Sequence, residues 1–413
     1  MQNNNIPKIR FNGFTAPWEQ RKLGDIVERV VRKNTNNESS LPLTISAQYG
    51  LVDQITYFNN RVASRDVSNY YLVLNGEFAY NKSTSDGFPF GAVKRLDLYE
   101  KGVLSTLYIV FSIKNQSEID SDYLTVFFDT DRWHKGVSER AAEGARNHGL
   151  LNISADDFFD IDIFLPRHKE EQVAIGSYLR HLDNLITLHQ RKYDKLTNVK
   201  KSMLEKLFPK NGASVPKIRF KGFSDAWEQR KLEVVARILG GKAWKASDYS
   251  DDGEYLVVTI ANVSGEVIIN DSVGNRISCD NPDVYLLNKG DILVSLTGNV
   301  GRVSKMSNIK GLLNQRVGKI LPNNSDINAD FLFHVLRNPH FERAMIDAGQ
   351  GAAQKNIRND DVLNYAFFLP VEKDEQNIIA HYFNRLDNLI TLHQCKLEKL
   401  KHIKQACLEQ MFL

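Results

Sequence analysis

The residues of this chain that could carry out chemistry are few, and none stands in the spacing that a known reaction requires. Gly240-Gly-Lys-Ala243 is the nearest match to a phosphate-binding loop, but it lacks both the spacing and the terminal Ser or Thr. Asn281-Pro282-Asp283 is the nearest match to the Asn/Asp-Pro-Pro-aromatic motif of amino-methyltransferases, and it has a single proline. We therefore expect no catalytic residue in this chain.

Metal and thiol chemistry are equally unsupported by the sequence. Cys279, Cys395 and Cys407 are scattered, and the chain contains neither a Cys-x-x-Cys pair nor a His-Glu-x-x-His motif. His189 and His393 recur at equivalent places in a repeat, but no acid or nucleophile motif accompanies them. We expect ordinary thiols, core or partly exposed histidines and no metal site.

The composition is that of a soluble globular protein, with 42% hydrophobic and 25% charged residues among 413. This length suffices for two to four domains that each bury a core. No apolar run reaches the ~18 residues that a membrane span needs, and the first residues lack the apolar stretch of a signal peptide. We expect a cytoplasmic protein. Its net charge of +3 is compatible with nucleic-acid binding without arguing for it.

Two sequence blocks occur twice and frame two segments that are unlike each other. Ile6–Leu23 returns as Val215–Leu232 with most positions identical, and Glu170–Leu196 returns as Asp374–Leu400. The segments between the paired blocks have similar lengths but little obvious similarity. This arrangement suggests two halves that meet the same partner and recognise different things.

The second repeated block has the period of a long helix. Apolar residues step by four and three along it in both copies, and only Lys200 and Lys404 interrupt this seam. Pro166 and Pro370 precede the two blocks, as expected at a helix N-terminus. Each helix should run for about 40 residues, or ~60 Å at 1.5 Å per residue. The simplest partner for each helix is the other one, in an antiparallel coiled coil.

The framed inserts are predicted to be mixed α and β. Three β-branched or apolar runs predict strands, namely Leu104–Phe111, Tyr255–Ala261 and Asp291–Ser295, whereas Tyr123–Phe128 and Phe331–Leu336 predict short helices. The predicted fold class is therefore α+β, with two globular domains alternating with two long helices. The predicted segments are domains at residues 1–165 and 211–369 and helices at residues 166–210 and 370–413.

This order of segments resembles the specificity (S) subunit of type I restriction-modification systems. The lead-in blocks at Ile6–Leu23 and Val215–Leu232, and the Leu-Pro-x(4)-Glu-Gln runs at Leu165–Gln172 and Leu369–Gln376, are similar to those of the family. The following segments match its recognition domains, closely in the second insert and loosely in the first: Leu287–Ser295, Gly298–Gly301, Asn314-Gln315, Gly351–Ile357, Gly76–Lys82 and Glu143–His148. The resemblance covers essentially the whole chain, and the doubled order of blocks carries it.

The resemblance implies a non-catalytic subunit that binds double-stranded DNA. Each recognition domain would recognise one half of a bipartite, asymmetric target, and the paired helices would hold the domains apart. A ~60 Å pair spans at most ~17 base pairs at ~3.4 Å each. Two methyltransferase subunits and the restriction (motor-nuclease) subunits would join the chain. S-adenosylmethionine, ATP and magnesium would belong to those partners, and this chain would hold no cofactor.

Polar loops supply the candidate DNA-binding residues, because base edges and phosphates are bound by Arg, Lys, Asn, Gln, Ser and Thr. The candidates are Lys82, Ser83, Thr84, Arg146, Asn147, His148, Lys242, Lys245, Thr297, Asn299, Arg302, Gln315, Arg316, Gln354 and Lys355. An ordinary solvated turn remains the alternative for each loop. Trp244, between two of these lysines, either stacks on a ligand or lies half-buried in a surface loop.

The eight residues Leu182–His189 return unchanged as Leu386–His393, polar positions included. The polar residues that lie off the apolar seam are predicted to be exposed and to dock the methyltransferase subunits: Asp183, Asn184, Thr187, Asp387, Asn388 and Thr391. Recent duplication is the alternative explanation. Trp18 and Trp227 recur in register, and we expect them to pin each insert to the helices.

Two other functions remain open from the sequence. The first is a self-contained DNA modification enzyme with an unrecognised active site, which the missing methyltransferase motifs disfavour. The second is a coiled-coil scaffold with no DNA role. Binding of S-adenosylmethionine by the purified chain would support the first, and failure to retard random duplexes at low salt would support the second.

Overall fold

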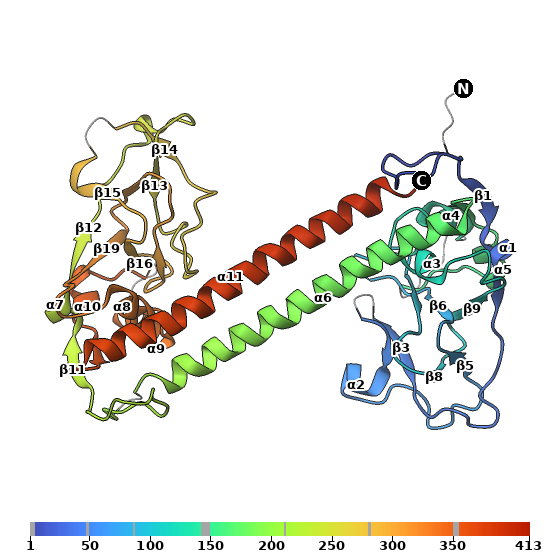
Figure 1. Ribbon diagram of the computed structural model, residues 1–413, viewed down its shortest axis with the longest axis horizontal. Helices are drawn as coiled ribbons and strands as arrows, with labels where there is room; N and C mark the ends of the chain where they lie inside the picture. Colours follow the sequence, from blue (N-terminus) through green and yellow to red (C-terminus); the bar gives the residue numbers. More distant parts are fainter. Residues whose placement is uncertain are drawn as a thin grey trace. The chain divides into compact units, whose positions relative to one another are not determined.

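The computed structural model describes residues 5–46, 49–85, 87–141, 149–209, 212–279, 282–349 and 355–413. The chain divides into two compact units (Figure 1). Unit 1 comprises Met1–Gln190 with Cys395–Leu413, and unit 2 comprises Arg191–Gln394. Each unit therefore contains one insert and one half of each long helix.

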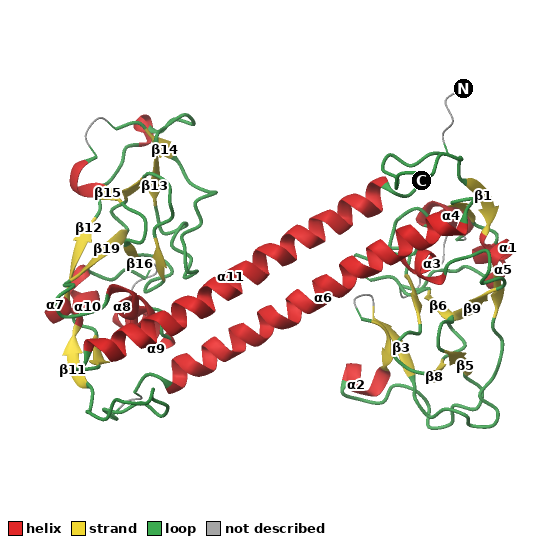
Figure 2. Cartoon of the chain, in the orientation of Figure 1, coloured by secondary structure: helices red, strands yellow, loops and turns green. Residues whose placement is uncertain are grey.

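Unit 1 is built from short strands and short helices (Figure 2). Its strands are β1 (Glu19–Lys22), β2 (Val27–Arg29), β3 (Leu43–Ser46), β4 (Gly50–Asp53), β5 (Tyr71–Leu74), β6 (Phe78–Asn81), β7 (Ala92–Arg95), β8 (Lys101–Leu104), β9 (Ile109–Ile113) and β10 (Asp162–Leu165). Its short helices are α1 (Leu23–Ile26), α2 (Gln54–Phe58), α3 (Ser121–Phe127), α4 (His134–Arg140) and α5 (Ala155–Phe159). The strands form a four-stranded sheet in the order β2-β9-β6-β7 and three pairs, β1-β10, β3-β4 and β5-β8.

Unit 2 follows the same plan. Its strands are β11 (Glu228–Lys231), β12 (Ala236–Gly240), β13 (Tyr255–Val258), β14 (Arg276–Ile277), β15 (Leu286–Leu287), β16 (Ile292–Ser295), β17 (Val303–Lys305), β18 (Gly311–Leu313), β19 (Val317–Pro322) and β20 (Ala366–Leu369). Its short helices are α7 (Leu232–Val235), η1 (Ala246–Asp248), η2 (Asp283–Tyr285), α8 (Ala329–Leu336), α9 (Pro339–Ala348) and α10 (Asn359–Leu363). The sheets are β12-β19-β16-β17, β14-β13-β18-β15 and β11-β20.

The two inserts thus share a framework although their sequences differ. The order β2-β9-β6-β7 in unit 1 matches β12-β19-β16-β17 in unit 2, and the pair β1-β10 matches β11-β20. One strand prediction was wrong, because the run Leu104–Phe111 contains the end of β8, a turn and the start of β9. A hydrogen bond from Tyr108 N to Ser105 O, at 3.2 Å, closes that turn. Because the residues on both sides of the turn are apolar and buried, the composition of the run could not reveal the turn.

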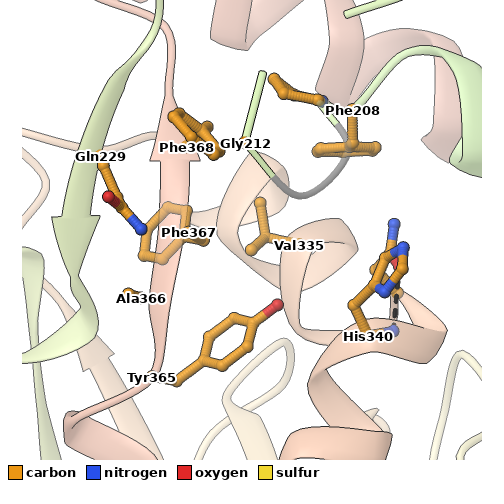
Figure 3. Close-up of a pocket in the computed structure, with 11 residues that line it drawn as sticks. Phe208, Gly212, Gln229, Val335, His340, Tyr365, Ala366, Phe367 and Phe368 are labelled. Carbon is orange, nitrogen blue, oxygen red and sulfur yellow. Dashed lines mark hydrogen bonds between the residues drawn. The ribbon is translucent and has the colours of Figure 1, made fainter. Parts of the chain in front are cut away.

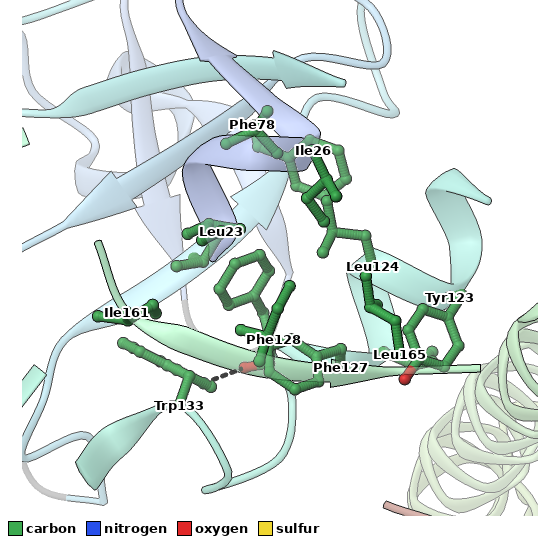
Figure 4. Close-up of a cluster of buried hydrophobic side chains, with 14 of the residues drawn as sticks. Leu23, Ile26, Phe78, Tyr123, Leu124, Phe127, Phe128, Trp133, Ile161 and Leu165 are labelled. Carbon is green, nitrogen blue, oxygen red and sulfur yellow. Dashed lines mark hydrogen bonds between the residues drawn. The ribbon is translucent and has the colours of Figure 1, made fainter. Parts of the chain in front are cut away.

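The main core of unit 1 is rich in aromatic side chains (Figure 4). Phe78 stacks on Phe111 with 5.4 Å between ring centroids, across neighbouring strands of the four-stranded sheet. Trp133 is buried, and its indole N–H donates to the carbonyl oxygen of Phe128 at 3.2 Å. This hydrogen bond removes the cost of burying an unpaired indole donor.

The two long helices are α6 (Lys169–Lys206) and α11 (Lys373–Gln410), each of 38 residues. Acidic residues occupy the first turn of both helices, where the helix dipole favours negative charge. Among the helices that the structure describes, none is long and apolar enough to cross a membrane. Both helices are instead amphipathic, with buried positions at heptad spacing in each unit.

The lead-in block of unit 1 is fastened to the start of α6 by a buried carboxylate. Glu171 is fully buried and accepts from both Nε and Nη2 of Arg10, at 2.6 and 2.7 Å. The indole N–H of Trp18 donates to the same carboxylate at 3.3 Å. A charge-assisted bidentate bond of this kind compensates the burial of both charges.

Unit 2 repeats this fastening with the equivalent residues. Glu375 accepts from Nε and Nη2 of Arg219 at 2.7 and 2.8 Å, and from the indole N–H of Trp227 at 3.1 Å. Both tryptophans are about 2% exposed, which confirms that they pack between insert and helix. The glutamine after each glutamate has a matching role, since its side-chain oxygen accepts from the backbone N–H that precedes α3 or α8.

Within unit 1, the first half of α6 and the last part of α11 pack side by side and run antiparallel. Lys404 contacts Asp183 at 2.7 Å, and Cys407, further along α11, lies close to Tyr178, which lies earlier in α6. The end of the chain then enters the core, where Phe412 meets Trp18 edge to face at 6.2 Å. The last residues of the chain are therefore core residues of the unit that contains its first residues.

Within unit 2, the second half of α6 and the first half of α11 pack in the same way. Lys200 forms an ion pair with Asp387, and Phe208, further along the chain, stacks on Phe383 at 5.9 Å, earlier in α11. Phe208 also meets Trp227 edge to face at 6.1 Å. Each unit therefore contains the predicted antiparallel helix pair.

Candidate nucleic-acid interface

Unit 2 carries a ladder of surface segments at the end of β16. Directly after Ser295, where β16 ends, Leu296 O accepts from Ile357 N at 2.9 Å. Gly298 N donates to Lys355 O at 2.8 Å, so residues 296–298 and 355–357 form two backbone hydrogen bonds. The late loop of the insert is thereby joined directly to the central sheet.

The same segment is joined on its other side to the start of β19. Leu296 N donates to Arg316 O at 2.9 Å, and Gln315 N donates to Lys242 O at 3.0 Å. Four segments far apart in the sequence thus lie edge to edge. We call residues 242–245, 296–299, 314–316 and 355–357 the second rim.

The second rim displays cations and amides and, among these residues, no carboxylate. Six of the predicted DNA-binding residues are exposed on it: Lys242, Lys245, Asn299, Gln315, Arg316 and Lys355. Thr297 is half-buried. Lysine and arginine suit phosphate oxygens, whereas asparagine and glutamine suit base edges. The structure therefore brings together side chains that the sequence could only propose one loop at a time.

Trp244 anchors one end of the second rim. Its indole N–H donates to Leu313 O at 3.0 Å, and its ring meets Tyr285 edge to face at 6.0 Å. The ammonium group of Lys242 lies 4.8 Å from the ring centroid, within cation–π range. Of the two interpretations of this tryptophan, the half-buried anchor of a surface loop fits these contacts.

Arg302 does not join the other candidates. It directly precedes β17, and its Nε is 3.8 Å from a carboxylate oxygen of Glu342 on α9. Its backbone N–H donates to the side chain of Ser295 at 3.0 Å. The guanidinium therefore faces a carboxylate outside the second rim, and its role in DNA binding stays a prediction.

Unit 1 has a matching ladder at the end of β6. Thr84 N donates to Gly149 O at 2.6 Å, and Leu151 N donates to Lys82 O at 3.0 Å. These two bonds correspond to those that join residues 296–298 to 355–357 in unit 2. We call residues 82–85 and 149–151 the first rim.

Side chains of the first rim are tied to the backbone of unit 1. The Lys82 ammonium donates to Ile153 O at 3.2 Å, and the Thr84 hydroxyl donates to Gly149 O at 3.0 Å. Ser83 is exposed between them. The candidates Arg146, Asn147, His148 and Gln354 lie outside the described residues and stay predictions.

Comparison with known proteins places this geometry in a family. The model of the type I restriction modification DNA specificity domain matches the chain twice, over residues 16–198 and 224–402. The chain belongs to the type I restriction-modification specificity family. Each match covers one rim together with the end of the lead-in block and part of the following helix.

Two relatives from Methanocaldococcus jannaschii match along almost their whole length. The type I restriction enzyme MjaVIII specificity subunit is 26% identical over 95% of this chain and 92% of its own. The putative type I restriction enzyme MjaX specificity subunit is 24% identical over 97% and 94%. In fold, the chain is similar to the crystal structure of a type I S subunit from M. genitalium, with a TM-score of 0.66, 14% identity and 99% of both chains covered.

Two of the six predicted docking residues are not exposed, and that part of the prediction was wrong. The Asp387 side chain is 5% exposed and pairs with Lys200 and with Arg337 Nη1, the latter at 3.2 Å. The Asp183 side chain is 31% exposed and pairs with Lys404. The two lysines that interrupt the apolar seam hold these aspartates, so a helix–helix ion pair explains why both positions repeat.

The other four docking candidates are exposed: Asn184, Thr187, Asn388 and Thr391. Leu188 and Leu392, which lie next to the two threonines, are 46% and 47% exposed. The helix pair within each unit leaves these leucines uncovered. Repeated polar and apolar side chains on an uncovered helix face are typical of a docking surface.

Sequence reasoning missed a buried charge cluster beneath α11 in unit 2. His334 is fully buried, and its Nε2 lies 2.9 Å from the Asn384 side-chain oxygen. Its Nδ1 has no hydrogen-bond partner and lies 4.0 Å from Asp387. Burial lowers the pKa of His334 to about 4, against the pull of Asp387 and Asn384, with Lys200 and Arg337 adding to the decrease. The interrupted seam at Lys200 was the one available signal.

A cavity of about 350 Å³ lies in unit 2 near the end of α6 (Figure 3). It is lined by Phe208, Pro209, Gly212, Gln229, Val335, Asn338, His340, Tyr365, Ala366, Phe367 and Phe368. None of the candidate DNA-binding residues lines it. In the part of the chain that the structure describes, no three His, Cys, Asp or Glu side chains come close enough together to hold a metal ion.

Proposed function

We propose that each unit recognises one half of a bipartite, asymmetric DNA target, and that the chain directs methylation and restriction by partner subunits. The observation that carries this proposal is the pair of rims. Both contain an equivalent pair of backbone hydrogen bonds at the end of equivalent strands, β6 and β16, yet they present different side chains. A shared scaffold with divergent polar surfaces is what two different half-sites require.

Sequencing of the methylated bases in a host that carries the intact system tests this proposal. The expected result is one motif made of two short, different half-sites separated by unspecified bases. A continuous or palindromic motif would contradict it. We call the half-sites proposed for unit 1 and unit 2 the first and the second half-site. Lys82 and Thr84 of the first rim are bonded to backbone carbonyls of unit 1. We therefore expect the rim side chains to contribute more to recognition of the second half-site than of the first.

We propose that the chain performs no chemistry and that its partners hold S-adenosylmethionine, ATP and magnesium. The rival proposal, a self-contained DNA modification enzyme, predicts that the purified chain alone binds S-adenosylmethionine. Isothermal titration with S-adenosylmethionine separates the two, first on the chain and then on its complex with methyltransferase subunits. We also propose a cytoplasmic location for the chain, because its DNA target would lie there.

We propose that two methyltransferase subunits dock on the repeated helix faces, one on each unit. The repeated Asn184, Thr187 and Leu188 in unit 1, and their counterparts in unit 2, support this stoichiometry. Replacing Asn184 and Leu188 with lysines should remove one methyltransferase subunit, and the matching change at Asn388 and Leu392 should remove the other. Light scattering of the complex measures the stoichiometry, and two bound partners in both variants would exclude this face.

We also propose that α6 and α11 set the distance between the half-sites. Inserting one heptad in each helix, within 197–206 and 401–410, preserves the seam and adds about 10 Å of helix. The unspecified gap should lengthen and the half-sites should stay the same. An active complex with an unchanged gap would show that the helices do not determine the spacing.

A further inference from the structure

The loop Leu296–Gly301, whose residues 296–299 belong to the second rim, closes around one buried hydroxyl. Ser295 is fully buried at the end of β16, and its Oγ donates to Asn299 O at 2.5 Å. The same Oγ accepts from Arg302 N at 3.0 Å. One serine side chain therefore bonds both to the tip of the loop and to the residue where β17 resumes the sheet.

The backbone of Ser295 closes the same loop a second time. Its N–H donates to Arg302 O and its carbonyl oxygen accepts from Gly301 N, both at 2.9 Å. Gly298 and Gly301 have φ of +73° and +79°, a region that residues with a side chain rarely adopt. A Cβ on Gly301 would also lie 2.7 Å from the Cβ of Met345. These constraints leave the loop one main conformation.

The loop carries two of the predicted DNA-binding side chains. Asn299 is exposed at the tip of the loop, and its own backbone carbonyl accepts the hydrogen bond from Ser295. Thr297 lies two residues before it on the rim. Bidentate recognition of a base is stronger when the amide is fixed in position before DNA arrives, since ordering a loop on binding lowers the affinity. The buried hydroxyl supplies that order without facing the solvent.

Unit 1 closes its equivalent loop differently. Asn81 ends β6 as Ser295 ends β16, but its side-chain oxygen accepts from Ser83 N at 3.0 Å, only two residues away. The loop that follows it runs from Lys82 to Gly91 before β7 begins, and is longer than the loop of unit 2. A change at Ser295 should therefore affect one half-site and not the other.

We propose that Ser295 is a positioning residue for recognition of the second half-site. Its hydroxyl does not contact DNA. It fixes the backbone of Asn299 so that the amide of Asn299 meets its base in a single orientation. This inference rests on the proposed function of the second rim and adds to it the residue that sets the loop's conformation.

The test uses the full chain assembled with its methyltransferase partners and a duplex that contains the target found by methylome sequencing. Two further duplexes each carry one base change, in the half-site assigned to unit 1 or in that assigned to unit 2. The measured quantity is discrimination, the ratio of Kd for the changed and the correct duplex. The variants are Ser295→Ala, Ser295→Thr, which keeps the hydroxyl, and the control Ser307→Ala, a buried serine of unit 2 whose Oγ has no hydrogen-bond partner.

Ser295→Ala should lower discrimination at the second half-site by about tenfold, the size expected when one or two buried hydrogen bonds are lost. Discrimination at the first half-site should stay unchanged, Ser295→Thr should restore the second, and Ser307→Ala should match the parent chain. Equal losses in both half-sites, no loss at all, or a threonine variant as impaired as the alanine variant would each overturn the proposal.

Gly298→Ala gives a second route to the same answer if Ser295→Ala does not fold. It strains the same loop through its positive φ and leaves the buried serine in place. The expected result is again a loss confined to the second half-site, and unchanged discrimination would overturn the proposal. Failure of the proposed function would look different, because the parent chain itself would then show no discrimination in one or both half-sites.

Discussion

Lys200 and Lys404 occupy equivalent places in the two helices, yet the two units shift their pKa values in opposite directions. Burial alone would lower the pKa of Lys404, but the carboxylates of Asp129 and Asp183 raise it above its ordinary value. Burial lowers the pKa of Lys200, and nearby Arg337 adds to the decrease against the pull of Asp387. The helices repeat, whereas the inserts beneath them do not.

The difference comes from one position of the inserts. Asp129 and Arg337 stand the same number of residues after the N-cap residues of α3 and α8, Asp120 and Asn328. In unit 1 a second lysine, Lys94, pairs with Asp129 at 2.7 Å. Opposite charges at equivalent positions are thus accommodated by their neighbours, and the helix geometry is retained.

The rims and the helix entries show the same contrast between what repeats and what diverges. The bonds of Glu171 in unit 1 recur at Glu375 in unit 2, and the backbone ladders recur at both rims. The exposed side chains of the rims do not recur. Contacts that fasten an insert to its helix are therefore separate from the surface proposed to bind DNA, and this separation can be tested.

The largest effect is expected when an entire insert is exchanged. Replacing residues 24–165 with the equivalent insert of another family member should replace one half-site completely and leave the other half-site and the gap unchanged. The physical reason is that Arg10, Trp18 and Glu171, whose bonds fasten the insert to α6, all lie outside the exchanged segment. Methylome sequencing measures the outcome, with exchange of residues 233–369 as the reciprocal control. A change in both half-sites, or in neither, contradicts independent units.

The next largest effect is expected from the buried carboxylates. Glu375→Ala leaves Arg219 and the Trp227 indole without their partner, and removal of one member of a buried ion pair costs about 3–5 kcal/mol. Hydrogen exchange should increase in unit 2 only, and Glu171→Ala should increase it in unit 1 only. Glu19→Ala, which breaks the exposed pair with Arg167, is the matched control and should change little. Equal loosening of both units would mean that they are not independently fastened.

A smaller effect separates the units by pH. His334 has a pKa of about 4 in the folded chain and 6.5 as its ordinary value, so the unfolded chain binds more protons between these values. Above pH 6.5 His334 is neutral in both the folded and the unfolded chain. As the pH falls from 6.5 toward 4, the free energy of unfolding of unit 2 should decrease by up to roughly 3 kcal/mol. Val126 stands at the equivalent position of unit 1, where burial also lowers the pKa of the partly buried His134, so unit 1 should show a weaker dependence.

Urea unfolding at several pH values, followed by hydrogen exchange in each unit, measures this loss. His334→Gln cannot titrate and keeps a side chain able to hydrogen-bond to Asn384. It should flatten the pH dependence of unit 2 between pH 6.5 and 4. A variant with the same pH dependence as the parent chain would assign the loss to other groups.

The smallest effect concerns single cations of the second rim. Lys242→Ala should lower the slope of log K against log salt by roughly 1, because each phosphate contact contributes about that much. Discrimination between base sequences should stay the same. Lys201→Ala removes the same charge from an exposed position on α6 and serves as the control. An unchanged slope for Lys242→Ala would remove this lysine from the interface.

Much of the scaffold was predictable because the sequence blocks that form it occur twice in the chain. The duplicated blocks predicted the two long helices, their antiparallel pairing and the packing of Trp18 and Trp227. The strand run Leu104–Phe111 was mispredicted because a turn between two buried strands has the composition of one strand. The predicted late loops Glu143–His148 and 351–354 lie outside the described residues and stay predictions. Residues 355–357 join the second rim, and the sequence could not show that partner or its register.

Sequence periodicity determined which elements form and which residues repeat, because heptad spacing and the two-residue period of strands are local properties. It could not determine the exposure of Asp183 and Asp387. Each aspartate is covered by a lysine of the other long helix, Lys404 for Asp183 and Lys200 for Asp387. Sequence periodicity also could not predict that residues 242–245, 296–299, 314–316 and 355–357 form one surface. Backbone hydrogen bonds join these segments, and such bonds cannot be inferred from the types of the side chains. Only the tertiary structure decided those contacts, because long-range pairing is chosen by the packing of the whole unit.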